Sequence, residues 1–343
     1  MNRCSRFHLI NVVWGKIYTK FFLDLCLPTQ LSPGNVPAFR NLERAVYKIY
    51  TTAQDAETII KHPSYSVLSD TIDTQIKIFN FPDEYLKNYK HTAMNSCHQH
   101  AVVEANKDNC GLVFLIPDGA YADGSLNKLI DLSKAGKRAV MLSTYRINKE
   151  TFVPEFVELF NPHSLPTISV STRELVRLSL KHLHPVTEAL FWKSTGSKSA
   201  WPSINIWRVS NEEILIRQFH LHPLMVIPSR KDVLPSPTID GKYISMGCSN
   251  LDEVYIVEDS DEMYYCELSK PDMYRDHIRS EGWTDIKFVA QWMESQTDSF
   301  HRYCLKNYRI RHHANGISPK WEKIKRESDI IINEVESVFT ASS

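Results

Sequence analysis

Residues 111–125 read Gly-Leu-Val-Phe-Leu-Ile-Pro-Asp-Gly-Ala-Tyr-Ala-Asp-Gly-Ser, and the fold class follows from them. The unbroken apolar run from Leu112 to Ile116 predicts a strand that is buried on both faces. The run ends at Pro117-Asp118-Gly119, so a carboxylate stands where the predicted strand leaves the core. In open α/β sheets, ligands bind beyond the carboxyl ends of the strands. We therefore expect a ligand that carries a phosphate group or a metal at Asp118.

An amphipathic helix is expected directly after this turn. Its apolar positions are Leu126, Leu129, Ile130 and Leu132, and Gly136 provides the stop signal. Residues 138–142, Arg-Ala-Val-Met-Leu, predict a second buried strand. A strand, an acidic turn, a helix and another strand together require a right-handed parallel crossover.

The chain before residue 111 shows the same alternation. Strands are expected at 7–15, 47–51 and 75–79. Helices are expected at 18–27, from Gln54 onward and at 83–106. Pro28 is expected to end the first of these helices, and Thr51 or Thr52 to cap the second. Strands separated by helices predict a doubly wound sheet of the nucleotide-binding type over the first ~150 residues.

From residue 151 onward the pattern changes. It predicts a helix that begins at the capping box Ser171-Thr172-Arg173-Glu174, followed by a polar lid at 193–199. Paired strands are expected at 204–209 and 213–219, and a buried strand at 254–257. A helical tail is expected from about 271 to 339, with Trp283 among its packing residues. The strand at 254–257 is followed by Glu258-Asp259-Ser260-Asp261. This second acidic turn is as well placed locally as the first.

The composition excludes several classes of protein. Of 343 residues, 43% are hydrophobic and 23% are charged, which is typical of a globular chain and argues against disorder. Forty basic residues balance forty acidic ones. A chain with no net charge is not expected to bind nucleic acid as a bulk electrostatic partner.

Cysteine usage and hydropathy indicate a compartment. The seven cysteines are odd in number and scattered, which favours a reduced cytosolic location over a disulfide framework. The apolar run at 7–14 is short and interrupted, so we expect no signal peptide. No run approaches the ~20 apolar residues of a membrane span. Membrane contact is therefore expected to be peripheral at most.

Four segments together resemble the nucleotide-binding half of a GT-A-type glycosyltransferase. They are Val13-Trp14-Gly15, Leu31-Ser32-Pro33-Gly34-Asn35, Tyr50-Thr51-Thr52 and the stretch from Pro117-Asp118 to Gly124-Ser125. The resemblance covers residues 7 to 150 in order and extends more loosely to about 265. It implies a mixed, doubly wound α/β sheet flanked by helices, with a C-terminal helical extension.

The resemblance also implies a division of the chain and a donor site. Residues 1–150 would form the nucleotide-sugar-binding half, 151–270 the acceptor-side half and 271–343 the helical extension. The residues implied to hold the nucleotide are Trp14, Gly15, Thr51, Asp118 and Gly119.

In such enzymes an acidic motif and a later histidine hold a divalent metal, here Mn²⁺ or Mg²⁺. The resemblance places the metal at Asp118 and His222, although the usual Asp-any-Asp is absent at Asp118, and Asp123 lies too far along to be the second acid. A literal Asp-any-Asp occurs at Asp259-Ser260-Asp261, so Asp259 and Asp261 form a competing metal site. The alternative to a metal role is structural in both places: Asp118 would only cap a turn, and Asp259 and Asp261 would only belong to a solvated acidic turn.

Two residues are expected to act on the acceptor. Asp240, in Thr238-Ile239-Asp240-Gly241, is the candidate base that deprotonates an acceptor hydroxyl. His222, in His220-Leu221-His222-Pro223, is the second catalytic candidate because histidine titrates near neutral pH. A simple Asp-Gly turn and a packed histidine are the alternatives.

The resemblance therefore implies a glycosyltransferase that moves a sugar from a nucleoside diphosphate-sugar donor to a glycan or lipid-linked acceptor in surface polysaccharide synthesis. It is expected in the cytoplasm, peripheral to the inner membrane face at most. One alternative is a non-catalytic nucleotide- or sugar-binding protein of the same fold. The other is a metal-dependent hydrolase built on Asp118, His220, His222 and Asp259.

Overall fold

The computed structural model describes residues 4–192, 198–248, 250–279 and 286–342. The chain forms two compact units, of which the first comprises Met1–Leu142, Val157–Ser171 and His222–Ile256, and the second Ser143–Phe156, Thr172–Leu221 and Val257–Ser343. Helix α8 (Lys149–Phe160) contains one of the borders. Two predicted features, most of the lid at 193–199 and the packing of Trp283, lie outside the described residues. The three-part division at residues 150 and 270 remains a prediction.

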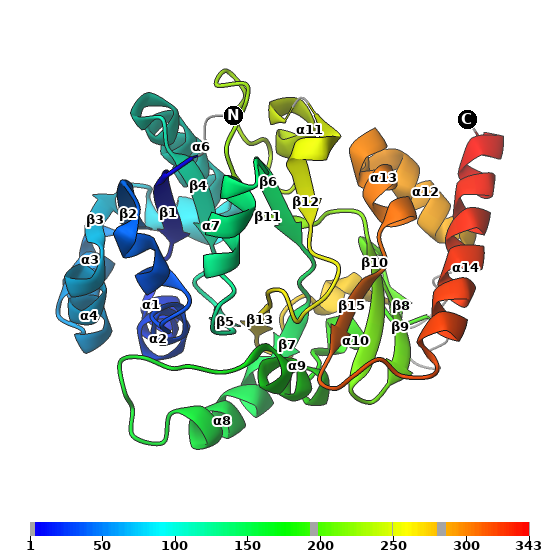
Figure 1. Ribbon diagram of the computed structural model, residues 1–343, viewed down its shortest axis with the longest axis horizontal. Coiled ribbons are helices and arrows are strands. Elements are labelled where there is room, and N and C mark those ends of the chain that lie inside the picture. Colours follow the sequence, from blue (N-terminus) through cyan, green and yellow to red (C-terminus); the bar gives the residue numbers. More distant parts are fainter. Residues whose placement is uncertain (1–3, 193–197, 249, 280–285, 343) are drawn as a thin grey trace. The chain divides into compact units, whose positions relative to one another are not determined.

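The first unit is built on a seven-stranded sheet with the order β12-β6-β11-β4-β1-β2-β3 (Figure 1). Its strands are β1 (Arg6–Val12), β2 (Arg44–Thr51), β3 (Asp73–Ile78), β4 (Gly111–Leu115), β6 (Ala139–Leu142), β11 (His222–Val226) and β12 (Val254–Ile256). β1 pairs in parallel with β2 and β4, and β2 with β3; β12 pairs in parallel with β6. β11 alone runs antiparallel, between β4 and β6.

Helices connect these strands. They are α1 (Lys16–Phe21), α2 (Leu27–Gln30), α3 (Ala53–Ile60), α4 (Pro63–Thr71), α5 (Asp83–Asn88), α6 (Lys90–Asp108), α7 (Asn127–Lys134) and α11 (Tyr243–Gly247), with a short strand β5 (Gly119–Tyr121) after β4. The predicted mixed α/β sheet flanked by helices is confirmed. The predicted crossover from β4 to β6 also exists, but β11 is inserted between its two strands.

Local sequence explains most of these boundaries. All five residues of β4 are buried, as expected for an apolar strand covered on both faces. The Thr52 side chain caps α3 by accepting a hydrogen bond from the amide of Asp55 at 3.2 Å. Pro28 does not end the first helix, because the chain stays helical from Lys16 to Gln30 through α1, a π-helical turn (Phe22–Cys26) and α2, which contains Pro28. The predicted helix at 83–106 is two helices that meet at Tyr89.

The second unit combines short sheets with helices. Its elements are β7 (Arg146–Asn148), α9 (Thr172–Lys181), α10 (Pro185–Glu188), β8 (Lys198–Ser199), β9 (Ile204–Ser210), β10 (Glu213–Gln218), β13 (Tyr265–Ser269), β14 (Ile278–Arg279), α12 (Ile286–Gln296), α13 (Ser299–Asn307), β15 (Ile310–His313) and α14 (Trp321–Ser342). β9, β10 and β15 form an antiparallel sheet, β7 pairs in parallel with β13, and β8 pairs antiparallel with β14. The tail is therefore mainly helical, as predicted, but β14 and β15 interrupt it.

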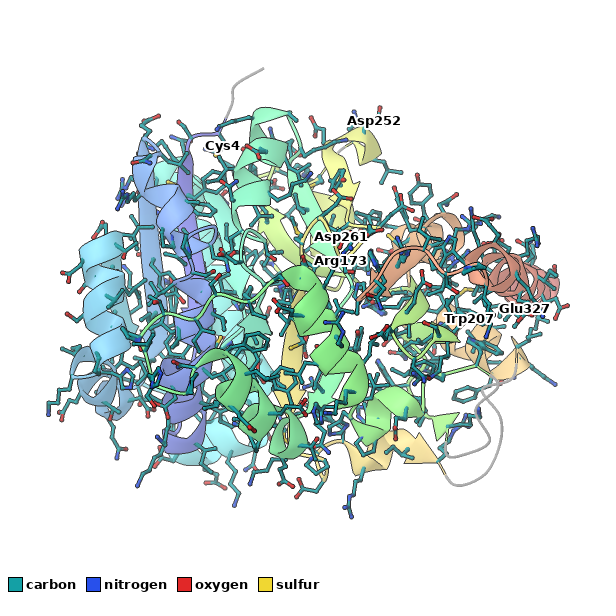
Figure 2. The ribbon with its side chains drawn as sticks, turned by 60° about the horizontal axis from the view of Figure 1, so that its bottom comes forward. Cys4, Arg173, Trp207, Asp252, Asp261 and Glu327 are labelled. Atoms are coloured by element: carbon teal, nitrogen blue, oxygen red, sulfur yellow. The ribbon has the colours of Figure 1, made fainter. Side chains whose placement is uncertain are left out.

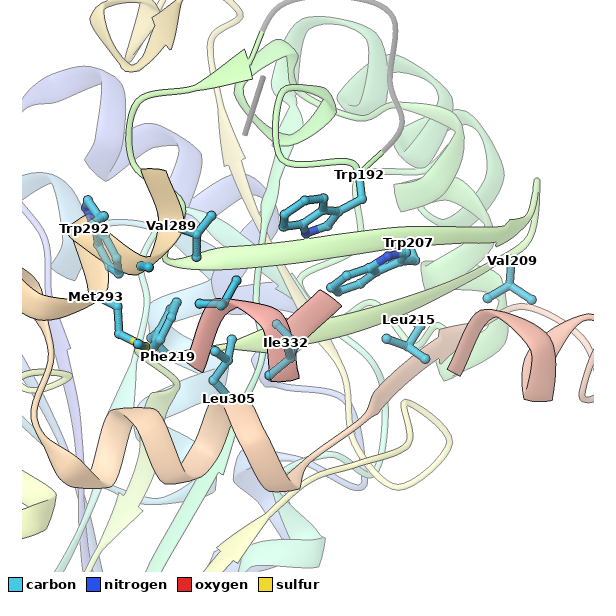
Figure 3. Close-up of a cluster of buried hydrophobic side chains, with 12 residues drawn as sticks. Trp192, Trp207, Val209, Leu215, Phe219, Val289, Trp292, Met293, Leu305 and Ile332 are labelled. Atoms are coloured by element: carbon cyan, nitrogen blue, oxygen red, sulfur yellow. The ribbon is translucent and has the colours of Figure 1, made fainter. Parts of the chain in front are cut away.

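An aromatic core holds the second unit together. Figure 3 shows Trp192 and Trp207 beside β9 and β10, with Val289 and Trp292 from α12 and Ile332 from α14. The rings of Trp192 and Trp207 stack with centroids 5.7 Å apart and planes 10° from parallel. Packing of α12 and α14 against this sheet explains why the C-terminal helix is part of the fold.

His8 lies inside the first unit and is fully buried in β1. Burial and the charge of nearby Lys48 lower the pKa of His8 to about 4, although Asp108 opposes them. In the unfolded chain histidine titrates near 6.5. The stability that neutral His8 maintains is thus complete above pH 6.5 and is lost as the pH falls toward 4.

We predict that His8→Phe makes the protein less sensitive to acid. Between pH 7.5 and 4.5 the wild type should lose about 2 kcal/mol of unfolding free energy more than the variant, because only the wild type must protonate a buried imidazole. Urea unfolding at both pH values measures this, with His163→Phe, at an exposed histidine, as the control. An equal gap between wild type and variant at both pH values contradicts the prediction.

Candidate functional site

The predicted donor residues gather at one edge of the first unit's sheet. Asn11 of β1 pairs with Leu115 of β4, and Val12 of β1 pairs with Tyr50 of β2, in parallel register. The carboxyl ends of these three strands therefore lie at the same edge. From β1 the chain continues to β2 on one side, whereas β4 lies on the other side. Such a reversal of strand order is where open α/β sheets bind ligands.

The turn after β1 is held by the start of α3. The amide of Gly15 donates to Oδ2 of Asp55 at 2.7 Å, and the hydroxyl groups of Thr19 and Thr52 donate to the same carboxylate at 3.1 and 2.8 Å. Gly15 has a φ of 84°, a conformation that glycine adopts without strain. Asp55 was not singled out as a site residue by sequence reasoning, yet it fixes the backbone at the expected nucleotide loop.

Trp14 and Thr51 flank this turn. Trp14 is half-buried, and its ring lies edge-on to Phe79 at 5.7 Å. The Thr51 side chain is buried at the end of β2, and its hydroxyl has no hydrogen-bond partner among the described residues. A buried hydroxyl without a partner is uncommon, so Thr51 offers an unused polar group near the expected nucleotide.

The acidic turn after β4 is held by neighbours on both sides. The amide of Ile116 donates to the Tyr121 hydroxyl at 2.8 Å, and the Ile116 carbonyl accepts from Gln30 and Cys26. Asp118 follows two residues later and is half-buried, and Gly119 begins β5 and is buried. The main chain that carries Asp118 is therefore fixed on a rigid strand end.

Asp123 has a structural role that the sequence did not predict. Its carboxylate accepts from the amide of Gly34 at 2.7 Å and from the hydroxyl of Ser169 at 2.7 Å. A Cβ atom at Gly34 would lie only 2.6 Å from the backbone of Gly124, so only glycine allows this close approach. The loop at 31–35 thus docks on the acidic turn through backbone contacts.

His222 and Asp240 lie near a third group, the buried His98 of α6. Nε2 of His222 lies 3.0 Å from the carbonyl oxygen of Phe114, and because a carbonyl only accepts, this nitrogen carries the hydrogen. The ring of His98 packs edge-on against Phe114 at 5.3 Å. Burial and the charge of His222 together lower the pKa of His98 to about 3, although the charge of Asp240 raises it. The two predicted catalytic residues therefore lie around one buried histidine.

A different group of side chains has the composition of a metal site. Among the described residues, one group of at least three possible metal ligands lies close together. It consists of Asp259, Asp261 and His313, and their ligand atoms all lie within 4.8 Å of one another. It lies in the second unit. Asp259 and Asp261 are the competing metal pair of the sequence, whereas His313 of β15 was missed. Hard carboxylate oxygens and one imidazole suit Mn²⁺ and related divalent cations.

Backbone pairing brings these residues together. The amide of Arg311 donates to the Glu258 carbonyl at 2.7 Å, and the amide of Ser260 donates to the Arg311 carbonyl at 2.9 Å. The Ser260 hydroxyl also accepts from the amide of His313 at 3.1 Å. The acidic turn therefore runs along β15, which places His313 beside both aspartates.

The hydrogen bonds of His313 determine what its ring presents to the aspartates. Nδ1 donates to the carbonyl of Asn315. Nε2 therefore faces the carboxylates, 2.9 Å from Oδ1 of Asp259 and 3.5 Å from Oδ2 of Asp261. Histidine ligands of metals commonly donate their other N–H to a carbonyl in this way. Either a proton or a metal ion on Nε2 satisfies this arrangement.

The electrostatics of the cluster favour the charged forms. Burial raises the pKa of Asp259, but the hydrogen bond from His313 and the charge of Arg311 outweigh it and lower the pKa to about 2. Burial lowers the pKa of His313, but the hydrogen bonds to Asp259 and Asn315 leave it raised. At neutral pH both aspartates are ionised, as metal ligands must be.

The remaining predicted residue, His220, packs elsewhere. Its ring lies 4.2 Å from the ring of His301 and 5.8 Å from that of Trp292, within the second unit. His222 belongs to the first unit, so the border between the units separates the two histidines.

The described part of the chain contains no helix with both the length and the apolar character that crossing a lipid bilayer requires.

Comparisons with known proteins give little more. No protein-family profile matches the chain, and no curated protein matches it. A solved structure that is similar in part is assigned as a glucose-1-phosphate thymidylyltransferase from Bacillus anthracis, in complex with sucrose. It has 11% identity and a TM-score of 0.25, over 40% of this chain and 55% of that chain. The matched region thus spans about half the length of that structure, and a likeness of this size carries no inference about activity.

Proposed function

We propose that the protein is a glycosyltransferase that uses a nucleoside diphosphate-sugar donor and a glycan or lipid-linked acceptor. The observation that carries this proposal is the reversal of strand order between β1 and β4. Trp14, Gly15, Thr51 and Asp118 follow or end the strands at this point, where α/β sheets bind nucleotides.

The proposed activity depends on a divalent cation, and the residues proposed to bind it lie in the second unit. Asp259, Asp261 and His313 would hold Mn²⁺ or Mg²⁺, whose charge would neutralise phosphate oxygens. Aspartate pairs alone occur on many surfaces without metal. The ring of His313, with Nδ1 bonded to the Asn315 carbonyl and Nε2 directed at both carboxylates, supports a cation site here.

The proposed chemistry requires few catalytic groups. Trp14 and Gly15 bind and orient the nucleotide, so that the reacting atoms are held in position. Asp240 accepts the proton of the acceptor hydroxyl, whose oxygen then bonds to the anomeric carbon as the diphosphate leaves. His222 orients the acceptor by hydrogen bonding. Asp118 positions the donor at the end of β4.

We predict that Asp118→Asn weakens metal-assisted binding of UDP or GDP about tenfold while the fold stays intact, because a carboxylate that would face the cation on the diphosphate is lost. Titration calorimetry with a panel of nucleoside diphosphates, with and without Mn²⁺, measures the affinities. Asp131→Asn, at an exposed acid of α7 in the same unit, is the matched control.

The outcomes separate the alternatives. Unchanged affinity in Asp118→Asn excludes Asp118 from the donor site and leaves Asp259 and Asp261 as the acidic pair that acts on the donor. Nucleotide binding without turnover of any nucleotide-sugar supports a non-catalytic binding protein of this fold. Mn²⁺-driven cleavage of phosphoesters that is lost in Asp259→Asn supports the metal-dependent hydrolase.

A further inference from the structure

Arg173 of α9 holds one of the proposed cation ligands. Its Nε lies 3.0 Å from Oδ1 of Asp261, and its Nη2 lies 2.7 Å from Oδ2. Both oxygens of the carboxylate are thus engaged by one guanidinium, and Figure 2 shows the two residues adjacent, with Arg173 on α9. This pair holds the pKa of Asp261 below its usual range, because Arg173 donates hydrogen bonds to the ionised form.

The other aspartate is held differently. Nη1 of Arg311 lies 3.1 Å from Oδ2 of Asp259, while Nε of the same guanidinium lies 2.7 Å from Oε1 of Glu213. The Arg311 and Glu213 side chains are 9% and 3% exposed, so this pair is fixed in the interior. The Arg173 side chain is 51% exposed. Arg173 therefore has the freedom to leave its carboxylate, and Arg311 does not.

A divalent cation and Arg173 compete for the same atoms. A cation bound by Asp261 takes at least one oxygen that the guanidinium now occupies. The guanidinium fork matches phosphate as well as carboxylate, so a displaced Arg173 has an alternative partner in a phosphate group. Before cation binding, the carboxylates of Asp259, Asp261 and Glu213 face the guanidiniums of Arg173 and Arg311 and the imidazole of His313. A divalent cation that replaces the proton on Nε2 of His313 adds one positive charge to this cluster, which favours binding of an anion.

We propose that Arg173 is a displaceable latch on the cation site and the phosphate-binding residue of the loaded site. Without a cation, the Arg173 guanidinium pairs with the carboxylate of Asp261. When the cation binds, Arg173 is released and its guanidinium binds the oxygens of a phosphate group that the loaded cation attracts. The proposal rests on the cation site described under the proposed function and adds to it a phosphate contact and the order of binding, with cation before phosphate.

The first part of the test measures Mn²⁺ affinity of the full-length protein by titration calorimetry. Arg173→Gln should bind Mn²⁺ about two- to fivefold more tightly than the wild type, because an exposed competing ion pair has been removed. Arg177→Gln is the matched control. Arg177 lies one turn further along α9, and its Nε lies 3.2 Å from Oε1 of Glu212, so the substitution removes a similar surface pair without touching Asp261.

The second part measures the affinity for pyrophosphate at saturating Mn²⁺. Arg173→Gln should bind it about tenfold more weakly, because a bidentate charge-assisted contact is lost, while Arg177→Gln stays at the wild-type value. The opposite signs of the two effects distinguish a latch from a residue that only stabilises the fold.

Two further outcomes separate this proposal from the one on which it rests. If Asp261→Asn abolishes Mn²⁺ binding but Arg173→Gln leaves either affinity at the wild-type value, the latch is wrong and the cation site stands. If Asp261→Asn and the wild type bind Mn²⁺ equally, the cation site itself is wrong, and the role of Arg173 is overturned with it.

Discussion

Replacing His313 with glutamine is expected to weaken Mn²⁺ binding at least about a hundredfold, because the variant loses the only nitrogen ligand of the proposed three-residue set. Titration calorimetry of the full-length protein measures the affinity. His313 is buried, so circular dichroism and thermal unfolding must show that the variant is folded. Manganese affinity equal to that of the wild type would falsify the assignment of this metal centre.

A second variant keeps this prediction testable if the first is unstable. Asp261→Asn changes a ligand whose side chain is 39% exposed, so its effect on folding should be small. It should weaken Mn²⁺ binding to a similar extent, because the amide that replaces the carboxylate is neutral. Asp276→Asn, at an aspartate of the same unit with a side chain that is 83% exposed, is the matched control and should bind Mn²⁺ as the wild type does.

The pH dependence of cation binding follows from the raised pKa of His313. Below this pKa, the cation must displace the proton from Nε2 before it binds. Manganese affinity should therefore fall by up to about tenfold per pH unit in that range and become constant above it. Binding that does not vary with pH implies that His313 is not a ligand, even if both aspartates are.

The second large effect is expected in the core of the second unit. Trp207→Ala should lower the unfolding free energy by about 3–5 kcal/mol, because it removes a large buried ring and leaves a cavity. Trp207 is 2% exposed, stacks on Trp192, and belongs to the same cluster as residues of α12 and α14. Urea unfolding, followed by circular dichroism, measures the loss.

Trp201 offers a matched control for this substitution. It lies in the same unit and is 45% exposed; its ring forms a T-shaped pair with Trp292 at 5.2 Å and stacks on His277 at 6.3 Å. Trp201→Ala should change the unfolding free energy by about 1 kcal/mol or less. Equal losses in the two variants are incompatible with a core that is centred on Trp207, since the two substitutions remove the same number of atoms.

The two candidate regions differ in how far the sequence predicted them. Asp118 and its neighbours were placed at a common strand edge because parallel strands bring their carboxyl ends together, a rule that needs only the order of strands and helices. The structure agrees with that placement. Whether these residues bind a nucleotide remains a prediction, and Asp123 in the same turn is a structural residue that fixes the loop at 31–35.

The second region could be recognised only in part. Asp259-Ser260-Asp261 was visible as a motif, but nothing near it in the chain identifies a third ligand. His313 lies 54 residues after Asp259 and follows two helices, in a strand of four residues that was predicted as helical tail. A short strand gains its stability from its partners, so local propensity carries little information about it. Consecutive histidines after Ile310-Arg311 were the only local signal.

The sequence by itself determined the α/β class, the two buried strands β4 and β6 to within one residue, a threonine cap at residue 51 or 52, and the acidic residues that follow two strands. These features depend on hydrophobic periodicity and on hydrogen bonds within a few residues. The tertiary structure alone decided that β11 lies between β4 and β6, that the turn at 258–261 pairs with β15, and that Arg173 occupies Asp261. Such contacts join residues that are far apart in the chain, and their free energy comes from packing that no local pattern specifies.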